Sequence, residues 1–285
     1  MTHPRLAVLL GALFALVAEA SGGAGRPLRV MSIEACADQL VLALLPPEQI
    51  TSVTWLSRDP GLSLMARQAR GVGVNHGEAE EVLRDHPDLV VAGGYTSSAT
   101  RAALRKLGYP LLELPPIDNF DAVRRSTLTV ARAVGAEAKG AALVAQMDAV
   151  LRQLASSPAP RVRVAAWDSA QVSVQPSSMF DAELKAAGVR NVLGARAPAA
   201  EALLAAAPDL IVRGAPPDAP PGRRTDIADN PVVRRLWGDR IVVFAQVYYL
   251  CGTPFSAEGA ARLRQALREA ERRARSAPPR AAAAR

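Results

Sequence analysis

Cysteine, histidine and aromatic residues are all scarce in this chain. It contains two cysteines, three histidines and 4% aromatic residues. Two cysteines are too few to hold an iron–sulfur cluster, which needs about four thiolate ligands. Only His76 and His86 lie beyond the first 20 residues, whereas a zinc importer's binding protein usually needs several histidines. The aliphatic, aromatic-poor composition favours α/β layers over a β-sandwich.

The sequence also lacks the short motifs of several enzyme classes. It has no Gly-x-x-x-x-Gly-Lys-Ser/Thr loop, which excludes a P-loop ATPase. It has no Gly-x-Ser-x-Gly elbow of the kind that carries the serine nucleophile of hydrolases. The glycine-rich segment 71–77 does not have the spacing of a dinucleotide-binding fingerprint. We therefore expect a protein with no catalytic step.

Residues 1–20 have the pattern of an export signal. Arg5 supplies a positive start, residues 6–17 are apolar, and Ala18-Glu19-Ala20 offers small residues for cleavage. The alternative is a buried first helix. No cysteine follows the apolar stretch directly and no other run reaches 18 apolar residues, so neither a lipid anchor nor a membrane span is indicated. We expect a soluble protein in the periplasm.

The net charge of +7 does not indicate nucleic-acid binding, because much of it is concentrated near the C-terminus. Eight arginines lie between Arg262 and Arg285, and the last residues are mainly Ser, Ala, Pro and Arg. Such a composition cannot bury apolar surface, so residues 273–285 are expected to form a disordered basic tail. The tail is either simply solvated or contacts anionic lipid or envelope polymer.

A twelve-residue block occurs twice in the chain, at residues 80–91 and 201–212. Both copies fit Glu-x-Val/Leu-Leu-x-x-x-Pro-Asp-Leu-Val/Ile-Val. Each predicts a short helix, a Pro-Asp turn that ends it, and a branched aliphatic strand. One such unit in each half of the chain predicts two similar α/β lobes with a ligand cleft between them.

Strand and helix patterns alternate in both halves, which favours parallel sheets. The fold class predicted is α/β, with two Rossmann-like lobes joined by one long helix. The N-terminal lobe is expected over residues 27–135, the connecting helix over 136–157 and the C-terminal lobe over 160–272. Within the second lobe, Ser178 is expected to cap a helix over 179–187, and residues 241–245 to form the last strand.

The order of several segments resembles the periplasmic substrate-binding proteins of ABC importers for ferric siderophores, haem and cobalamin. The resemblance covers about residues 27–272. It depends on the opening strand with Ser32 to Gln39, the loop at Trp55 to Pro60, Pro87-Asp88-Leu89, and the loop from Tyr248 to Pro254.

The resemblance implies a monomeric receptor that binds one metal chelate, a ferric siderophore or a cobalamin-type corrinoid, with no resident metal or cofactor. It would deliver the chelate to a dimeric membrane permease coupled to a cytoplasmic ATPase. In cobalamin-binding members one Glu on each lobe docks into permease arginines, a role that carries over to Glu80 and Glu201. The alternative function is a periplasmic sensor or carrier that does not dock a permease.

The resemblance also implies a ligand held by loops at strand ends, where aromatic side chains give broad apolar contact and an arginine can meet an anionic group. The residues expected to form the first lobe's wall are Glu34, Cys36, Trp55, Arg58, His76 and Tyr95. Those expected on the second lobe are Trp167, Gln175, Tyr248 and Tyr249.

The two cysteines, Cys36 and Cys251, both fall in loops that the resemblance places at the cleft. A disulfide is natural in an oxidising periplasm, and between the lobes it would restrict opening unless the loops lie at the hinge. The thiols could instead coordinate a soft metal or be unrelated buried residues. The sequence leaves these three alternatives open.

Overall fold

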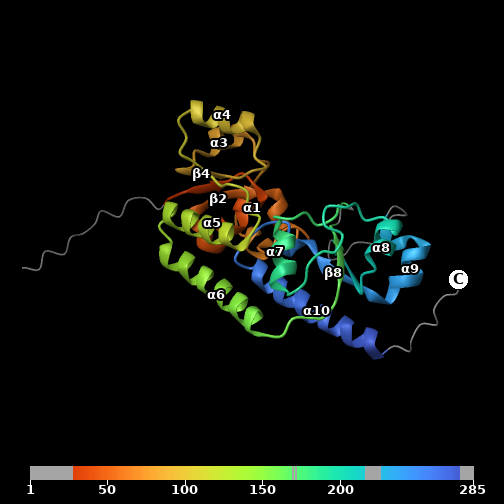
Figure 1. The fold of residues 1–285 in the computed structure, drawn as a ribbon. Coiled ribbons are helices and arrows are strands. Elements are labelled where there is room, and N and C mark those ends of the chain that lie inside the picture. The colour runs from red at the N-terminus through yellow and green to blue at the C-terminus, as the bar shows by residue number, and fades with distance from the viewer. Residues whose placement is uncertain (1–27, 169, 171, 216–225, 277–285) are drawn as a thin grey trace, which may run out of the picture.

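The structure, a computed structural model, describes residues 28–168, 170, 172–215 and 226–276. The predicted export signal over residues 1–20 lies outside these ranges, as do residues 277–285 of the predicted tail. Figure 1 shows two α/β lobes beside each other, with the long helix α6 running along one side. None of the helices in the described ranges is long and apolar enough to cross a membrane.

The N-terminal lobe is built on five parallel strands in the order β3-β2-β1-β4-β5. Its elements are β1 (Val30–Ser32), α1 (Ala35–Leu44), β2 (Ile50–Thr54), α2 (Ala66–Ala69), β3 (Gly73–Asn75), α3 (Ala79–Asp85), β4 (Leu89–Ala92), α4 (Ser98–Lys106) and β5 (Leu111–Glu113). The chain turns from one side of the sheet to the other between β1 and β4, and such a switch point leaves a crevice at the carboxyl ends of the strands.

The C-terminal lobe has three parallel strands in the order β6-β7-β8 within the described ranges. Its elements are β6 (Val164–Trp167), α7 (Met179–Ala186), α8 (Ala200–Ala206), β7 (Leu210–Ala215), α9 (Pro231–Trp237), β8 (Ile241–Ala245) and α10 (Ser256–Ser276). The α/β class with parallel sheets is therefore confirmed, and the last strand has the predicted bounds.

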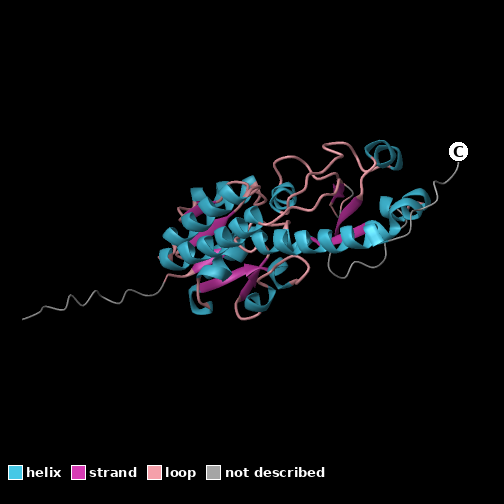
Figure 2. Ribbon diagram, turned by 60° about the horizontal axis from the view of Figure 1, so that its bottom comes forward, coloured by secondary structure: helices cyan, strands magenta, loops and turns pink. Residues whose placement is uncertain are grey.

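Helices cover both faces of the two sheets (Figure 2), so the strands are apolar on both sides. In the first lobe, Val30 packs with α1 and α5 (Phe120–Ala133), whereas its neighbour Met31 packs with α3 and α4. In the second, Ala166 packs with α7 and α10, whereas Trp167 packs with α8 and α9. Successive side chains point to opposite faces of a strand, and each face has its own layer of helices.

The repeated block forms the same local structure in both lobes. Helices α3 and α8 each end at a residue in the left-handed conformation, with φ of 44° at His86 and 43° at Ala207. The aspartate of each Pro-Asp turn then accepts a hydrogen bond from the backbone of the lobe's first strand segment. Asp88 Oδ2 lies 2.8 Å from the amide nitrogen of Arg29, and Asp209 Oδ2 lies 2.7 Å from that of Arg163. The Pro-Asp pair thus fixes one strand beside another.

The connection between the lobes consists of α5 and α6 (Glu137–Ser156). These helices meet closely at Gly140, where a Cβ would lie 2.4 Å from that of Ala131. A buried cluster joins α5, α6, α7 and α10, with Met147 of α6 packed against Met179 of α7. The predicted long connecting helix is therefore packed against both lobes along its length.

The last helix differs from the sequence prediction. Residues 273–276, expected to begin a disordered tail, form the final turn of α10. An ion pair between Glu271 and Arg275, one helical turn apart, stabilises this end of the helix. The prediction of disorder from residue 273 is therefore wrong for these four residues, because helical spacing of opposite charges outweighed the polar composition.

Candidate functional site

A cavity of about 570 Å³ lies between the lobes. The N-terminal lobe contributes the loops that follow β1, β4 and β5. The C-terminal lobe contributes the loop after β6, the start of α7 and the loop after β8. The loops after β1 and β4 flank the switch point of the first sheet, so the cavity occupies the crevice that parallel α/β topology creates.

The wall of the cavity is largely apolar. The described lining residues of this kind include Leu114, Pro115, Pro116, Ile117, Val172, Val174, Met179, Phe180, Tyr249 and Leu250. The rings of Phe180 and Tyr249 are stacked, with centroids 4.2 Å apart and planes at 11°. Phe244, a β8 residue, packs against Phe180 from behind at 5.4 Å. This aromatic stack gives the second lobe a rigid surface suited to a broad apolar ligand.

Three carboxylates also line the cavity: Glu34, Asp118 and Asp168. Glu34 caps α1, and its Oε2 accepts a hydrogen bond from the Ala37 amide at 3.0 Å. Its side chain is nearly buried, and burial raises its pKa, although hydrogen bonds from the amides of Cys36 and Ala37 oppose this shift. Asp168 accepts hydrogen bonds from the amides of Ala170 and Val172, each at 2.9 Å.

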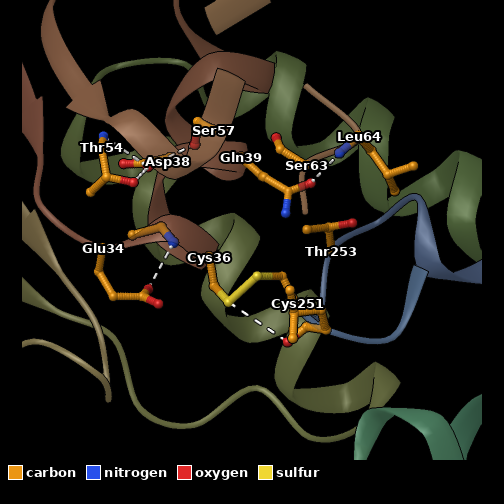
Figure 3. Close-up of a disulfide and its surroundings, with 12 residues drawn as sticks. Glu34, Cys36, Asp38, Gln39, Thr54, Ser57, Ser63, Leu64, Cys251 and Thr253 are labelled. Carbon is orange, nitrogen blue, oxygen red and sulfur yellow. Dashed lines mark hydrogen bonds between the residues drawn. A yellow bond between two sulfur atoms is a disulfide. The ribbon is translucent and has the colours of Figure 1, made fainter. Parts of the chain in front are cut away.

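Cys36 and Cys251 form a disulfide that joins the lobes at the edge of the cavity (Figure 3). Cys36 lies in the first turn of α1, and Cys251 in the loop after β8; their Cα atoms are 5.0 Å apart. Gly252 follows directly and approaches Ile117 so closely that a Cβ would lie 2.5 Å from Ile117 Cγ2. The sequence left open a disulfide, a soft-metal site and two unrelated buried thiols, and the structure contains the disulfide.

A buried polar network lies beside this disulfide in the first lobe (Figure 3). Asp38 Oδ2 accepts hydrogen bonds from the Thr54 amide at 3.0 Å, from the Thr54 hydroxyl and from the Ser57 hydroxyl at 2.7 Å. Burial raises the pKa of Asp38 to about 7, more than these hydrogen bonds lower it. The network ties the end of β2 to α1, the helix that carries Glu34 and Cys36.

The structure brings five of the ten predicted wall residues to the cavity: Glu34, Cys36, Tyr95, Gln175 and Tyr249. Tyr95 follows β4 and is 87% exposed, so its ring projects from the first lobe. Gln175 follows β6, and its Nε2 donates to the Ser173 carbonyl at 2.9 Å. These residues all follow strand ends, as the sequence analysis expected.

The prediction that Trp167 faces the cleft is wrong. Its side chain is fully buried, in the layer between the second sheet and helices α8 and α9. The reason is the alternation of side chains along β6: Ala166 faces α7, so its neighbour Trp167 faces the other way.

Four further predicted wall residues do not line this cavity either. Trp55 is 54% exposed on a short 3-10 helix after β2. Arg58 donates to the carbonyls of Ala69 and Val72, and the His76 ring nitrogen lies 3.2 Å from Glu81 Oε1. Tyr248 packs against Gly259 of α10 and lies beneath the guanidinium of Arg262.

The sequence analysis missed Asp118 and Asp168 as lining residues. Asp168 comes directly after β6, and Asp118 lies in the loop between β5 and α5. Both could have been found by applying the strand-end rule to every loop and not only to those with aromatic residues or cysteines.

Glu80 and Glu201 occupy equivalent, exposed positions in different lobes. Each is the second residue of its helix, α3 or α8. One turn further on, Leu83 and Leu204 are also equivalent to each other and are 39% and 51% exposed. No hydrogen bond or ion pair holds either glutamate within the described ranges. The two lobes thus present the same pair of side chains, an acidic group and an exposed leucine.

No protein-family model matches the chain, and no curated protein matches it. Several solved structures are similar to the chain. The periplasmic heme-binding protein RhuT from Roseiflexus sp. RS-1 is 20% identical, with a TM-score of 0.67 over 86% of this chain and all of that one. The periplasmic heme-binding protein HutB of Vibrio cholerae has a TM-score of 0.69 at 14% identity, covering 84% and 98% of the chains.

A third similar structure is the periplasmic vitamin B12 binding protein BtuF of Vibrio cholerae. It is 16% identical, with a TM-score of 0.64 over 85% of this chain and 97% of that one. The three proteins are similar over nearly their whole length but are named for different ligands, and at such low identity the likeness establishes the fold and not the ligand. The chain has the two-lobed α/β fold of these periplasmic binding proteins.

Proposed function

We propose that this protein is the periplasmic solute-binding component of an ABC importer. It would capture a metal chelate, a ferric siderophore or a cobalamin-type corrinoid, between its lobes and deliver it to the membrane permease. The observation that carries the proposal is the cavity, to which both lobes contribute strand-end loops. Proteins of the same fold bind heme or vitamin B12, as their names state, and the stacked Phe180 and Tyr249 suit a broad ligand of this kind.

Ligand capture is tested by calorimetric titration of the purified protein with cyanocobalamin, a panel of ferric siderophores and haemin. We expect saturable binding of one chelate at a one-to-one ratio. Absence of binding to every member of the panel would overturn the metal-chelate proposal. Tryptophan fluorescence is a poor substitute, since Trp167 is buried in the core and Trp55 does not line the cavity.

The proposal assigns permease docking to Glu80 and Glu201. Their support is the equivalent position in the two repeats, their exposure, and the exposed leucine one turn away in each lobe. A permease dimer presents two related surfaces, and two related lobes can meet them in the same way. The side-chain carboxylates would pair with permease arginines.

A double substitution, Glu80→Ala with Glu201→Ala, tests this assignment. Uptake in cells should be lost while the chelate affinity of the purified protein is unchanged. The matched control is Glu48→Ala with Glu137→Ala, two exposed glutamates at the beginnings of other helices, which should leave uptake intact. Normal uptake by the docking variant would favour the alternative function, a periplasmic sensor or carrier that does not dock a permease.

A further inference from the structure

The charge of the cavity is one-sided. Three carboxylates line it, and they come from three different segments: Glu34 from the β1–α1 junction, Asp118 from the β5–α5 loop and Asp168 from the β6–α7 loop. Among the described lining residues there is no lysine, arginine or histidine. The protein as a whole carries a net charge of +7, so the negative sign is a local property of the cavity.

In the part of the chain that the structure describes, no ion pair includes any of these three carboxylates. Their hydrogen-bond donors within the described ranges are neutral: the Cys36 and Ala37 amides for Glu34, the Asn119 side chain for Asp118, and two backbone amides for Asp168. Several acidic groups elsewhere differ: Asp148, Asp181 and Glu258 each have an arginine or lysine partner. The charged side chains of the described lining are therefore all acidic, and the cavity presents negative charge to whatever occupies it.

The carboxylates do not form a site for a bare metal ion. No group of three His, Cys, Asp or Glu side chains in the described part of the chain is close enough to hold one. The wall between them is apolar and aromatic, with Pro115, Pro116 and the Phe180–Tyr249 stack. Such a cavity fits a large ligand with apolar edges whose own charge is spread out or positive.

An anionic ligand would be opposed by this arrangement. At an effective dielectric constant of about 20, a single carboxylate about 10 Å from a unit negative charge weakens binding by about tenfold. Haem carries two propionates, and a ferric tricatecholate carries several negative charges. Basic side chains that meet those groups would favour binding of either ligand, and the described lining has none.

Resting on the proposed function, we infer that the cavity selects a metal chelate of neutral or positive charge, such as a ferric trihydroxamate or an uncharged corrinoid, and discriminates against anionic chelates. The selection comes from Glu34, Asp118 and Asp168, which together repel carboxylate or catecholate groups at the ligand edge. Several of the similar structures are named as heme-binding proteins. The inference therefore gives this chain a different preferred ligand class from those proteins, although the fold is the same.

Two matched ligand pairs test the inference by calorimetry at neutral pH and low salt. The first pair is ferrioxamine B, which has a free ammonium group, and its N-succinyl derivative, in which that group is replaced by a carboxylate. The second pair is cyanocobalamin and its monocarboxylic acid. In whichever pair binds, the anionic member should bind at least about tenfold more weakly, and the difference should shrink as salt is added.

The variant Asp118→Asn with Asp168→Asn should reduce this difference between pair members. Asparagine keeps an acceptor oxygen for the amides of Ala170 and Val172, so the β6–α7 loop should remain folded. The control, Glu48→Gln with Glu137→Gln, removes the same net charge at exposed positions outside the cavity lining and should leave the difference unchanged.

Equal or tighter binding of the anionic members, or haemin binding more tightly than both ferrioxamine B and cyanocobalamin, would overturn the inference while leaving a chelate receptor in place. Failure of every member of both pairs, and of haemin, to bind would overturn the proposed function and this inference together. An equal effect of the control and cavity variants would show that overall charge, and not the three cavity carboxylates, causes the preference.

Discussion

The disulfide between Cys36 and Cys251 should make a large contribution to stability, because it closes a very long loop that joins the two lobes. The two cysteines are 215 residues apart in sequence, and in the chain-entropy description a loop of that length contributes about 5 kcal/mol at 25 °C. For a domain pair of this size, a change of that order lowers the thermal midpoint by roughly 10–20 °C. Replacing both cysteines with serine should produce this loss.

The assay is thermal unfolding followed by circular dichroism, with oxidised wild type, reduced wild type and the double serine variant compared. Reduction should bring the wild type close to the variant, whereas the reductant should not change the variant. The disulfide also fixes the loop after β8, whose residues Leu250 and Gly252 line the cavity. The double serine variant should therefore bind its chelate more weakly. Equal midpoints for oxidised wild type and variant, or two titratable thiols in the native protein, would refute the reasoning.

Two further predictions concern the buried groups beside the cavity. Burial raises the pKa of Asp38 from 3.8 to about 7. Between these pH values the folded protein keeps a proton on Asp38 that the unfolded chain releases. The contribution of this proton to stability is therefore fully present below pH 3.8 and is lost as the pH rises through 7. The loss is on the order of 4 kcal/mol, and Asp38→Asn should flatten the pH dependence of the urea midpoint; matching curves for variant and wild type would contradict this. Phe180→Ala leaves a cavity beside Tyr249. It should lower the free energy of unfolding, measured with denaturant, by about 3–5 kcal/mol and should also weaken chelate binding. A loss below about 1 kcal/mol would mean that the stack is not well packed.

Local chemistry made much of the fold predictable. Ser178 caps α7, with its hydroxyl accepting from the Asp181 amide at 3.2 Å, because a serine before an apolar helical segment satisfies a free amide. The twelve-residue repeat predicted two equivalent helix–turn–strand units, and both are present with matching left-handed caps at His86 and Ala207. Each of these features depends on a few adjacent residues, which is why sequence alone specifies them.

The site was less predictable, because it depends on which way a side chain points. Strand β6 is apolar on both faces, so nothing in its sequence distinguishes Ala166, on the α7 side, from Trp167, on the α8 side. Arg58 was expected to meet a ligand, but its guanidinium is used by two backbone carbonyls of its own lobe. Asp118 has no local motif, and only its position in the loop after β5 could have marked it as a lining residue.

The central claim, that the chelate occupies the cavity between the lobes, is tested most directly by filling that cavity. Gly94 lines it, and the nearest atom to a Cβ added there is Pro116 Cγ at 4.0 Å, in the loop after the neighbouring strand β5. Gly238 is the matched control, with open space around a Cβ and a place outside the cavity lining. In calorimetric titrations with the chelate that the wild type binds, Gly94→Trp should abolish binding and Gly238→Trp should retain it. Retained binding by a folded Gly94→Trp protein would contradict the account.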